Sequence, residues 1–201
     1  MKKTPSRSLA YLVCKCGWGL ALCRTACDDK GRLSHVAGKL IVMDASRSFR
    51  EQLASLLDWE QAHVGFERAV DGLSTEMQGK KPQQLPFSCW QILEHMRLAQ
   101  KDILDYCREK DYAKKKWPDD YWPTEPAPPD AQAWVASVAA FQADRAELKK
   151  LAADSTVDLL QSVPSSKKHT LLREILVVAD HTAYHLGQLI YVRRLLGAWK
   201  D

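Results

Sequence analysis

The sequence contains no apolar run of about 18 or more residues, so we expect no helix that crosses a membrane. It also lacks alternating apolar and polar residues over a useful length, which argues against a β-sheet. A chain of 201 residues that is 46% hydrophobic is long enough to bury a core of its own. These absences leave an all-α domain as the expected fold.

A strong excess of one charge is also missing from most of the chain. Residues 43–201 contain 21 Lys and Arg against 23 Asp and Glu, whereas residues 1–42 contain eight basic and two acidic residues. The basic character therefore belongs to the N-terminal segment. The remainder gives no electrostatic reason to expect nucleic-acid binding.

The N-terminal segment, residues 1–42, matches no standard motif well. Basic residues precede a short apolar run, as at the start of a secretory signal, but no clear cleavage site follows. Four cysteines could bind zinc, although their spacing is not that of a standard zinc knuckle; they are Cys14, Cys16, Cys23 and Cys27. We favour an extension that is disordered or upstream of the native start, followed by one domain over residues 43–201.

Four helical segments with long connections are predicted in that domain. They cover residues 48–71, 89–110, 131–153 and 170–196. Ser48 and Ser88 have capping-box spacing, Asp130 is a typical N-cap, and Gly197 can end the last helix in a left-handed conformation. Cys89 and Cys107 lie within helical pattern and are interpreted as reduced core thiols of a cytoplasmic protein.

Residues 117–129 connect the second and third segments and contain five prolines and three aromatic residues. Proline at this density excludes the interior of a helix or sheet, and disordered linkers are poor in aromatic residues. We therefore expect an ordered lid, or a segment clamped across the helices.

Two histidines, His181 and His185, lie four residues apart in the last helical segment and project from one helix face. The other residues of that face are apolar, so both imidazoles should point into the core. An unpaired buried polar group costs on the order of 1–3 kcal/mol, so each imidazole needs a partner. His95 lies on a similar apolar stripe of the second segment. Two explanations stay open, namely separately hydrogen-bonded core histidines and a divalent metal bound by all three.

The pair is not the zinc-protease signature, because that motif places Glu directly after the first His and here Thr182 follows His181.

Three stretches carry a family resemblance: Pro86–Asp102, Trp117–Pro123 and Thr170–Gln188. Through them the chain, from about Ser46 to Trp199, resembles the DinB-like superfamily, which includes YfiT-type and thiol-transferase proteins of bacteria. The resemblance implies a four-helix bundle with long interhelical connections. It also implies a three-histidine metal site, which falls here on His95, His181 and His185.

Three neutral imidazoles and no carboxylate would leave open positions on a divalent metal, as in catalytic sites. Imidazole suits several metals, of which we expect zinc or nickel. The resemblance implies, for some members, transfer of a thiol onto a small electrophile in stress or detoxification. A metal-dependent hydrolase and a stress-associated metal-containing bundle without catalysis remain alternatives. The expected partner is a low-molecular-weight thiol or another small molecule, with a homodimer left open and neither nucleic acid nor membrane expected.

Five further residues are candidates for the pocket or for contacts to the ligands: His63, Asp102, Trp122, Tyr184 and Gln188. His63 could line the pocket mouth or be a surface residue. Asp102 lies almost two turns beyond His95 on nearly the same face. Trp122 would belong to the lid, unless the aromatic residues merely pin a long loop. His169 is expected to be an ordinary surface residue.

Overall fold

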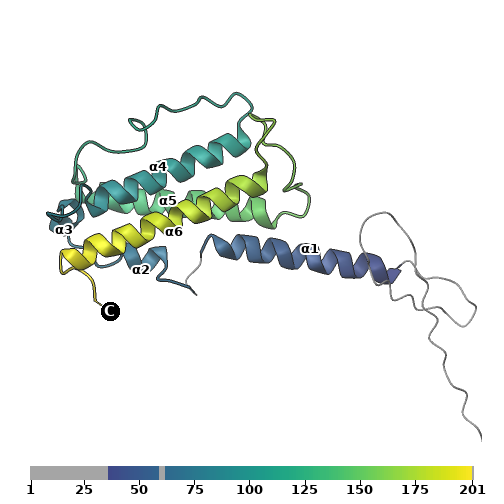
Figure 1. Cartoon of the computed structure of the whole chain (residues 1–201), viewed down its shortest axis with the longest axis horizontal. Helices are drawn as coiled ribbons and strands as arrows, with labels where there is room; N and C mark the ends of the chain where they lie inside the picture. Colours follow the sequence, from purple (N-terminus) through teal and green to yellow (C-terminus); the bar gives the residue numbers. More distant parts are fainter. Residues whose placement is uncertain (1–35, 59–61, 201) are drawn as a thin grey trace, which may run out of the picture. The chain divides into compact units, whose positions relative to one another are not determined.

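The computed structural model describes residues 36–58 and 62–200, with side chains described from residue 45. Its helices, shown in Figure 1, are α1 (Val36–Leu56), α2 (Phe66–Val70), α3 (Thr75–Gly79), α4 (Cys89–Arg108), α5 (Ala131–Ala153) and α6 (Leu171–Leu195). Within these described ranges there is no strand, and the one β-type contact is an isolated bridge between Ser162 and Thr170. The prediction of an all-α fold is confirmed.

The chain separates into two compact units, Met1–Met43 and Asp44–Asp201. The second unit contains every candidate site residue and is described below by itself. The signal-like residues and the four cysteines of the N-terminal segment lie outside the described residues.

The ends of the long helices follow local sequence signals. Ser88 and Gln91 form the expected capping box at the start of α4: Gln91 N donates to Ser88 Oγ at 3.2 Å and Ser88 N donates to Gln91 Oε1 at 3.3 Å. Asp130 caps α5 by accepting from Ala133 N at 2.8 Å. Gly197 follows α6 with a φ of +67°, the left-handed conformation that glycine adopts without strain.

The prediction of one helix over residues 48–71 is wrong. α1 already includes Ser48 and ends at Leu56, and a separate short helix, α2, begins at Phe66 after Gly65. Long-range contacts tie α1 to the loop after α5, where Arg50 donates hydrogen bonds to the carbonyls of Asp154 and Val157 at 2.7 and 2.6 Å.

The core consists of two apolar clusters along α4, α5 and α6, which lie side by side in Figure 1. Leu93, Phe141 and Leu189 belong to the first cluster, and Leu104 and Ile175 to the second. On α6 the two candidate histidines fall between the clusters, whereas on α4 His95 lies among residues of the first cluster, between Leu93 and Met96. Close-packed neighbours on both sides hold the backbone that presents the imidazoles.

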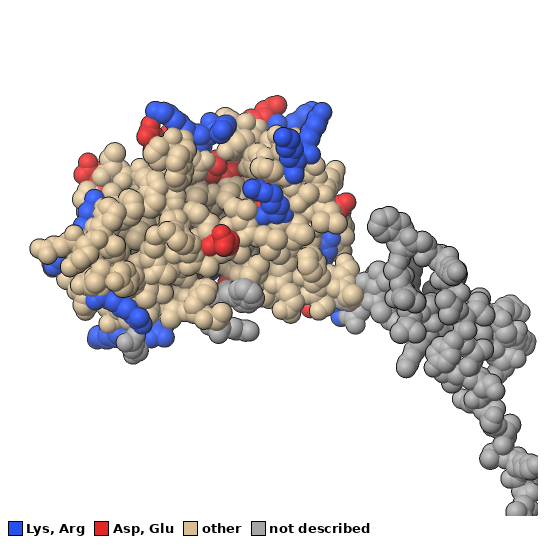
Figure 2. Space-filling model, viewed as in Figure 1, with Lys and Arg blue, Asp and Glu red and all other residues tan. Residues whose placement is uncertain are grey.

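The surface of this unit carries no large patch of one charge on the face shown in Figure 2, where basic and acidic groups are distributed among uncharged ones. None of the described helices is both long and apolar enough to span a bilayer.

Candidate metal centre

Three imidazoles from two helices converge at one point. α4 supplies His95 and α6 supplies His181 and His185, one turn apart. His95 Nε2 lies 3.1 Å from His185 Nε2 and 3.1 Å from His181 Nε2. His95 and His185 are 2% and 7% exposed, whereas His181 is half-buried. The structure thus brings together the three histidines that the sequence singled out.

Hydrogen bonds fix which nitrogen of two rings carries the proton. His95 Nδ1 lies 3.1 Å from the carbonyl oxygen of Tyr121, and His185 Nδ1 lies 2.7 Å from Gln188 Oε1. Both partners can only accept, so both Nδ1 atoms donate and both Nε2 atoms present a lone pair. If His181 carries its proton on Nε2, it can donate a hydrogen bond to His95 Nε2. This would still leave the lone pairs of His95 and His185 facing each other at 3.1 Å.

All three imidazoles stay neutral near pH 7. Burial lowers the pKa of His95 to about 4, against a smaller opposing effect of the Tyr121 carbonyl. Burial also lowers the pKa of His181 to about 4, and the neighbouring His185 and His95 lower it further. The pKa of His185 is lowered by burial too. Protonation therefore does not relieve the contact between lone pairs at neutral pH.

A cation bound by all three imidazoles would remove the repulsion between the lone pairs, and the geometry of the three residues fits such a cation. Imidazole nitrogens bind zinc at about 2.0–2.1 Å, which places neighbouring ligand nitrogens of a tetrahedral site about 3.3 Å apart. The ligand atoms of His95, His181 and His185 all lie within 4.8 Å of one another. Among the described residues, this group includes no carboxylate or thiol. The arrangement is a set of three neutral donors suited to a divalent metal.

Residues 117–129, hereafter the strap, run along α4 and cover one side of the site. Three side chains, from α4 and its N-cap, donate to carbonyls of the strap: Ser88 to Pro126 at 2.5 Å, Gln91 to Pro123 at 3.0 Å and His95 to Tyr121 at 3.1 Å. A proline-rich segment outside any helix or sheet leaves its carbonyls in need of donors. α4 supplies them, so the strap is an ordered segment clamped to the bundle.

Trp122 of the strap lies flat against His95. The two ring centroids are 3.8 Å apart and the planes differ by 6°. Phe87 stacks on Trp122 with a centroid distance of 4.2 Å. The indole is therefore sandwiched between Phe87 and a candidate ligand, and it fixes the orientation of that imidazole.

Two other predicted pocket residues contact the histidines directly, and a third is linked to them through Tyr121. Gln188 accepts from His185, and Tyr184 meets the His185 ring edge-on at 4.8 Å. Asp102 contacts no histidine but accepts a hydrogen bond from the Tyr121 hydroxyl. Tyr121 was expected only as one of the three aromatic residues of the covering segment, and its contact with His95 was not predicted, because a main-chain carbonyl makes it and a carbonyl has no sequence signature.

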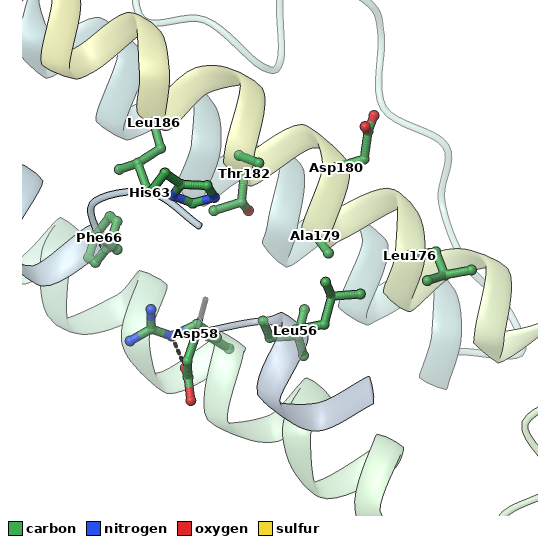
Figure 3. Close-up of a pocket in the computed structure, with 12 residues that line it drawn as sticks. Leu56, Asp58, His63, Phe66, Leu176, Ala179, Asp180, Thr182 and Leu186 are labelled. Atoms are coloured by element: carbon green, nitrogen blue, oxygen red, sulfur yellow. Dashed lines mark ion pairs between the residues drawn. The ribbon is translucent and has the colours of Figure 1, made fainter. Parts of the chain in front are cut away.

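His63 lies apart from the three histidines. It is exposed, its Nδ1 lies 3.0 Å from the carbonyl of Val64, and it lines a cavity of about 300 Å³ (Figure 3). α6 contributes Ala179, Thr182 and Ala183 to that cavity, and the two alanines lie on the helix face away from His181 and His185. The structure thus places His63 away from the candidate metal centre.

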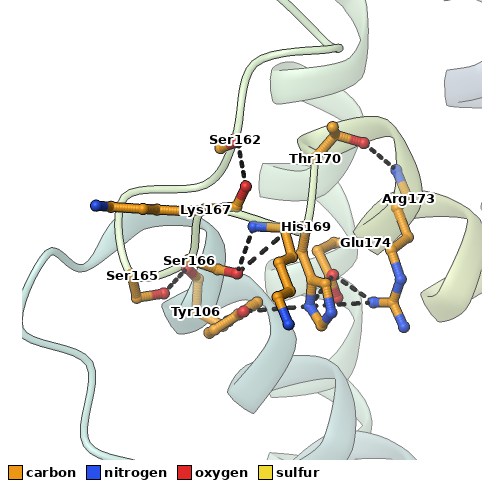
Figure 4. A network of polar contacts seen from close by, with 10 residues as sticks. Tyr106, Ser162, Ser165, Ser166, Lys167, His169, Thr170, Arg173 and Glu174 are labelled. Atoms are coloured by element: carbon orange, nitrogen blue, oxygen red, sulfur yellow. Dashed lines mark hydrogen bonds and ion pairs between the residues drawn. The ribbon is translucent and has the colours of Figure 1, made fainter.

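His169, expected to be an ordinary surface residue, is partly exposed and also belongs to a polar network at the far end of α4 (Figure 4). Its Nδ1 lies 3.2 Å from the Tyr106 hydroxyl and 3.3 Å from Glu174 Oε1. Glu174 is buried and also pairs with Arg173 at 2.5 Å. A glutamate on the apolar stripe of the helix was the available signal for a buried network. This network joins the loop before α6 to α4.

Comparison with known proteins agrees with this arrangement. A sequence model of the DinB superfamily matches residues 46–189, which include α4, α5 and all three histidines. No curated protein and no solved structure matches the chain significantly. The chain belongs to the DinB superfamily.

Proposed function

We propose that this protein is a metal-dependent transferase that joins a low-molecular-weight thiol to a small electrophile. The observation that carries the proposal is the convergence of three imidazole Nε2 atoms, that of His95 lying 3.1 Å from each of the other two, with no carboxylate in the group. His95, His181 and His185 would hold the metal, with zinc or nickel as the preferred ions.

The donor set favours a thiol as the reactant. Three neutral imidazoles leave the full charge of a divalent cation uncompensated, so the site attracts an anion. A bound divalent metal lowers the pKa of a thiol and supplies thiolate near neutral pH. The sulfur then forms a bond to the electrophilic carbon, and the displaced electron pair leaves with the leaving group or takes up a proton.

The thiol would come from a separate molecule. The two cysteines in the described part of the chain, Cys89 and Cys107, are buried, and burial raises the pKa of each to about 12. Both therefore remain protonated core thiols at neutral pH and cannot act as the nucleophile.

Two exposed aromatic side chains next to the histidines suit an apolar electrophile. Trp117 is 66% exposed and meets the His95 ring at a centroid distance of 6.2 Å. Tyr184 is 63% exposed and contacts His185. Trp122, by contrast, is already sandwiched. Rigid aromatic surfaces beside a few polar groups are the usual lining of a small-molecule site.

The test begins with metal content. The full chain, purified without a metal-binding tag, should contain about one equivalent of metal by elemental analysis. His95→Ala, His181→Ala and His185→Ala should each lose it while circular dichroism still shows a helical protein. His63→Ala is the matched control and should keep the metal. Retention of full metal content by two of the three variants would contradict the proposal that the three histidines bind the metal.

The second step measures turnover. Metal-loaded wild type should accelerate loss of an electrophile such as chlorodinitrobenzene in the presence of cysteine or glutathione, and the metal-free protein should not. Hydrolysis of a test ester without any thiol dependence would indicate a hydrolase instead. Stoichiometric metal with neither activity, across a panel of thiols, would indicate a bundle without catalysis.

A further inference from the structure

Asp102 is a buried carboxylate whose two oxygens are both bound by the segment that follows α4. It is 8% exposed and lies two turns beyond His95 on α4. Asp102 Oδ2 accepts from the Tyr121 hydroxyl at 2.6 Å, and Oδ1 accepts from the Tyr112 hydroxyl at 2.7 Å. Its side-chain hydrogen-bond partners among the described residues are these two hydroxyls.

Tyr121 is held at both of its ends. Its hydroxyl donates to Asp102, and its main-chain carbonyl accepts from His95 Nδ1 at 3.1 Å. A residue bound through its side chain and its backbone has little freedom to move the carbonyl. That carbonyl keeps the proton of His95 on Nδ1, so the lone pair of Nε2 points at His181 and His185.

We propose that Asp102 is a positioning residue of the three-histidine site, acting through Tyr121 to set the orientation and tautomer of His95. This inference rests on the proposed function only in requiring that the three histidines bind a metal. Partners that orient a ligand imidazole typically change metal affinity by about 10- to 100-fold when they are removed.

The alternative is that Asp102 does nothing more than anchor the segment after α4. Tyr112 allows the two roles to be separated. Its hydroxyl binds the same carboxylate, at nearly the same distance as that of Tyr121, but Tyr112 has no hydrogen bond to a histidine. Tyr121→Phe and Tyr112→Phe therefore each remove one hydroxyl that donates to Asp102. Of the two tyrosines, Tyr121 also contacts the candidate ligand His95.

The experiment uses the full chain loaded with Co²⁺, whose affinity is measured by competition with a chelator and whose visible spectrum reports ligand geometry. Tyr121→Phe and Asp102→Ala should weaken Co²⁺ binding by about 10-fold or more and shift the spectrum. Tyr112→Phe should change the affinity by less than about 3-fold. Thermal unfolding of the metal-free proteins should show a similar loss of stability for both Phe variants.

Equal Co²⁺ affinities for Tyr121→Phe and Tyr112→Phe would overturn the inference and leave anchoring as the role of Asp102. A wild-type chain that binds no Co²⁺ would overturn it as well. Both readouts are independent of turnover, so a metal-binding protein without thiol transfer would contradict the proposed function and leave the positioning role intact.

Discussion

Trp122 and His95 stack with their rings almost parallel, 3.8 Å apart between centroids. Helix α4 supplies the imidazole and the strap supplies the indole, so the segment that covers the site also orients one of its ligands. The strap is bound along α4 by Ser88, Gln91 and His95. It is therefore a fixed wall of the site in this structure, and the two tryptophans of the strap should have different roles.

We predict that Trp122→Ala lowers the free energy of unfolding by about 2–3 kcal/mol, because it empties the space between Phe87 and His95. Trp117→Ala, at a side chain that is 66% exposed, should cost less than about 0.5 kcal/mol. In an activity assay Trp117→Ala should raise KM for an apolar electrophile. Denaturant unfolding and kinetics on both variants check this. A lid role for Trp122 would instead appear as weaker substrate binding at unchanged stability.

The sequence predicts those parts of the structure that local or periodic signals encode. Ser88 with Gln91, Asp130 and Gly197 mark helix ends through contacts within a few residues, and the structure has them as expected. The three histidines stand out because helical spacing places them on otherwise apolar faces.

The parts that sequence reasoning missed depend on contacts between distant residues. Arg50 ties α1 to carbonyls that follow α5, more than 100 residues later in the chain. Tyr121 acts on His95 through its backbone, and any residue type could present that carbonyl. His169 has no feature of its own that distinguishes it from a surface histidine, and its partners come from α4 and α6. Neither spacing nor composition records such contacts.

A chain that begins at Met43 should keep the thermal stability and the metal content of the full chain. It retains Arg50 and Leu53 of α1 and Leu57 just after this helix; Arg50 binds a carbonyl after α5, and the two leucines belong to the second apolar cluster. A chain that begins at Asp58 lacks all three residues and should lose at least about 3 kcal/mol, since deleting one buried leucine side chain alone costs about 2–5 kcal/mol. Calorimetric measurement of the stability of the full chain and the two shortened chains tests this prediction. Loss of solubility or metal in the Met43 chain would contradict the prediction.

Gly79 should not tolerate a side chain, because a Cβ at this position would overlap Ala127 of the strap. We predict that Gly79→Ala destabilises the protein by about 1–3 kcal/mol, as overpacking usually does. Gly187→Ala is the matched control. It lies within α6 with nothing within 4 Å of the added carbon, so the better helix propensity of alanine should stabilise the protein by up to about 1 kcal/mol. In denaturant unfolding, the two substitutions should change the free energy of unfolding in opposite directions. Equal changes would argue against close contact between α3 and the strap.

The metal-free protein should lose stability as the pH falls from about 6.5 towards about 4. In the folded state burial lowers the pKa of His95 and His181 to about 4, whereas unfolded histidine titrates near 6.5. Between these values the unfolded chain binds protons that the folded chain does not, so protonation favours unfolding. Because carboxylates such as Glu94 also have a lowered pKa, the histidine contribution is isolated by comparing wild type with His181→Gln. Chelator-treated samples of both are unfolded in denaturant at a series of pH values. The free energy of unfolding should fall more steeply for wild type across this window, and parallel curves would show that His181 is not held neutral by the fold.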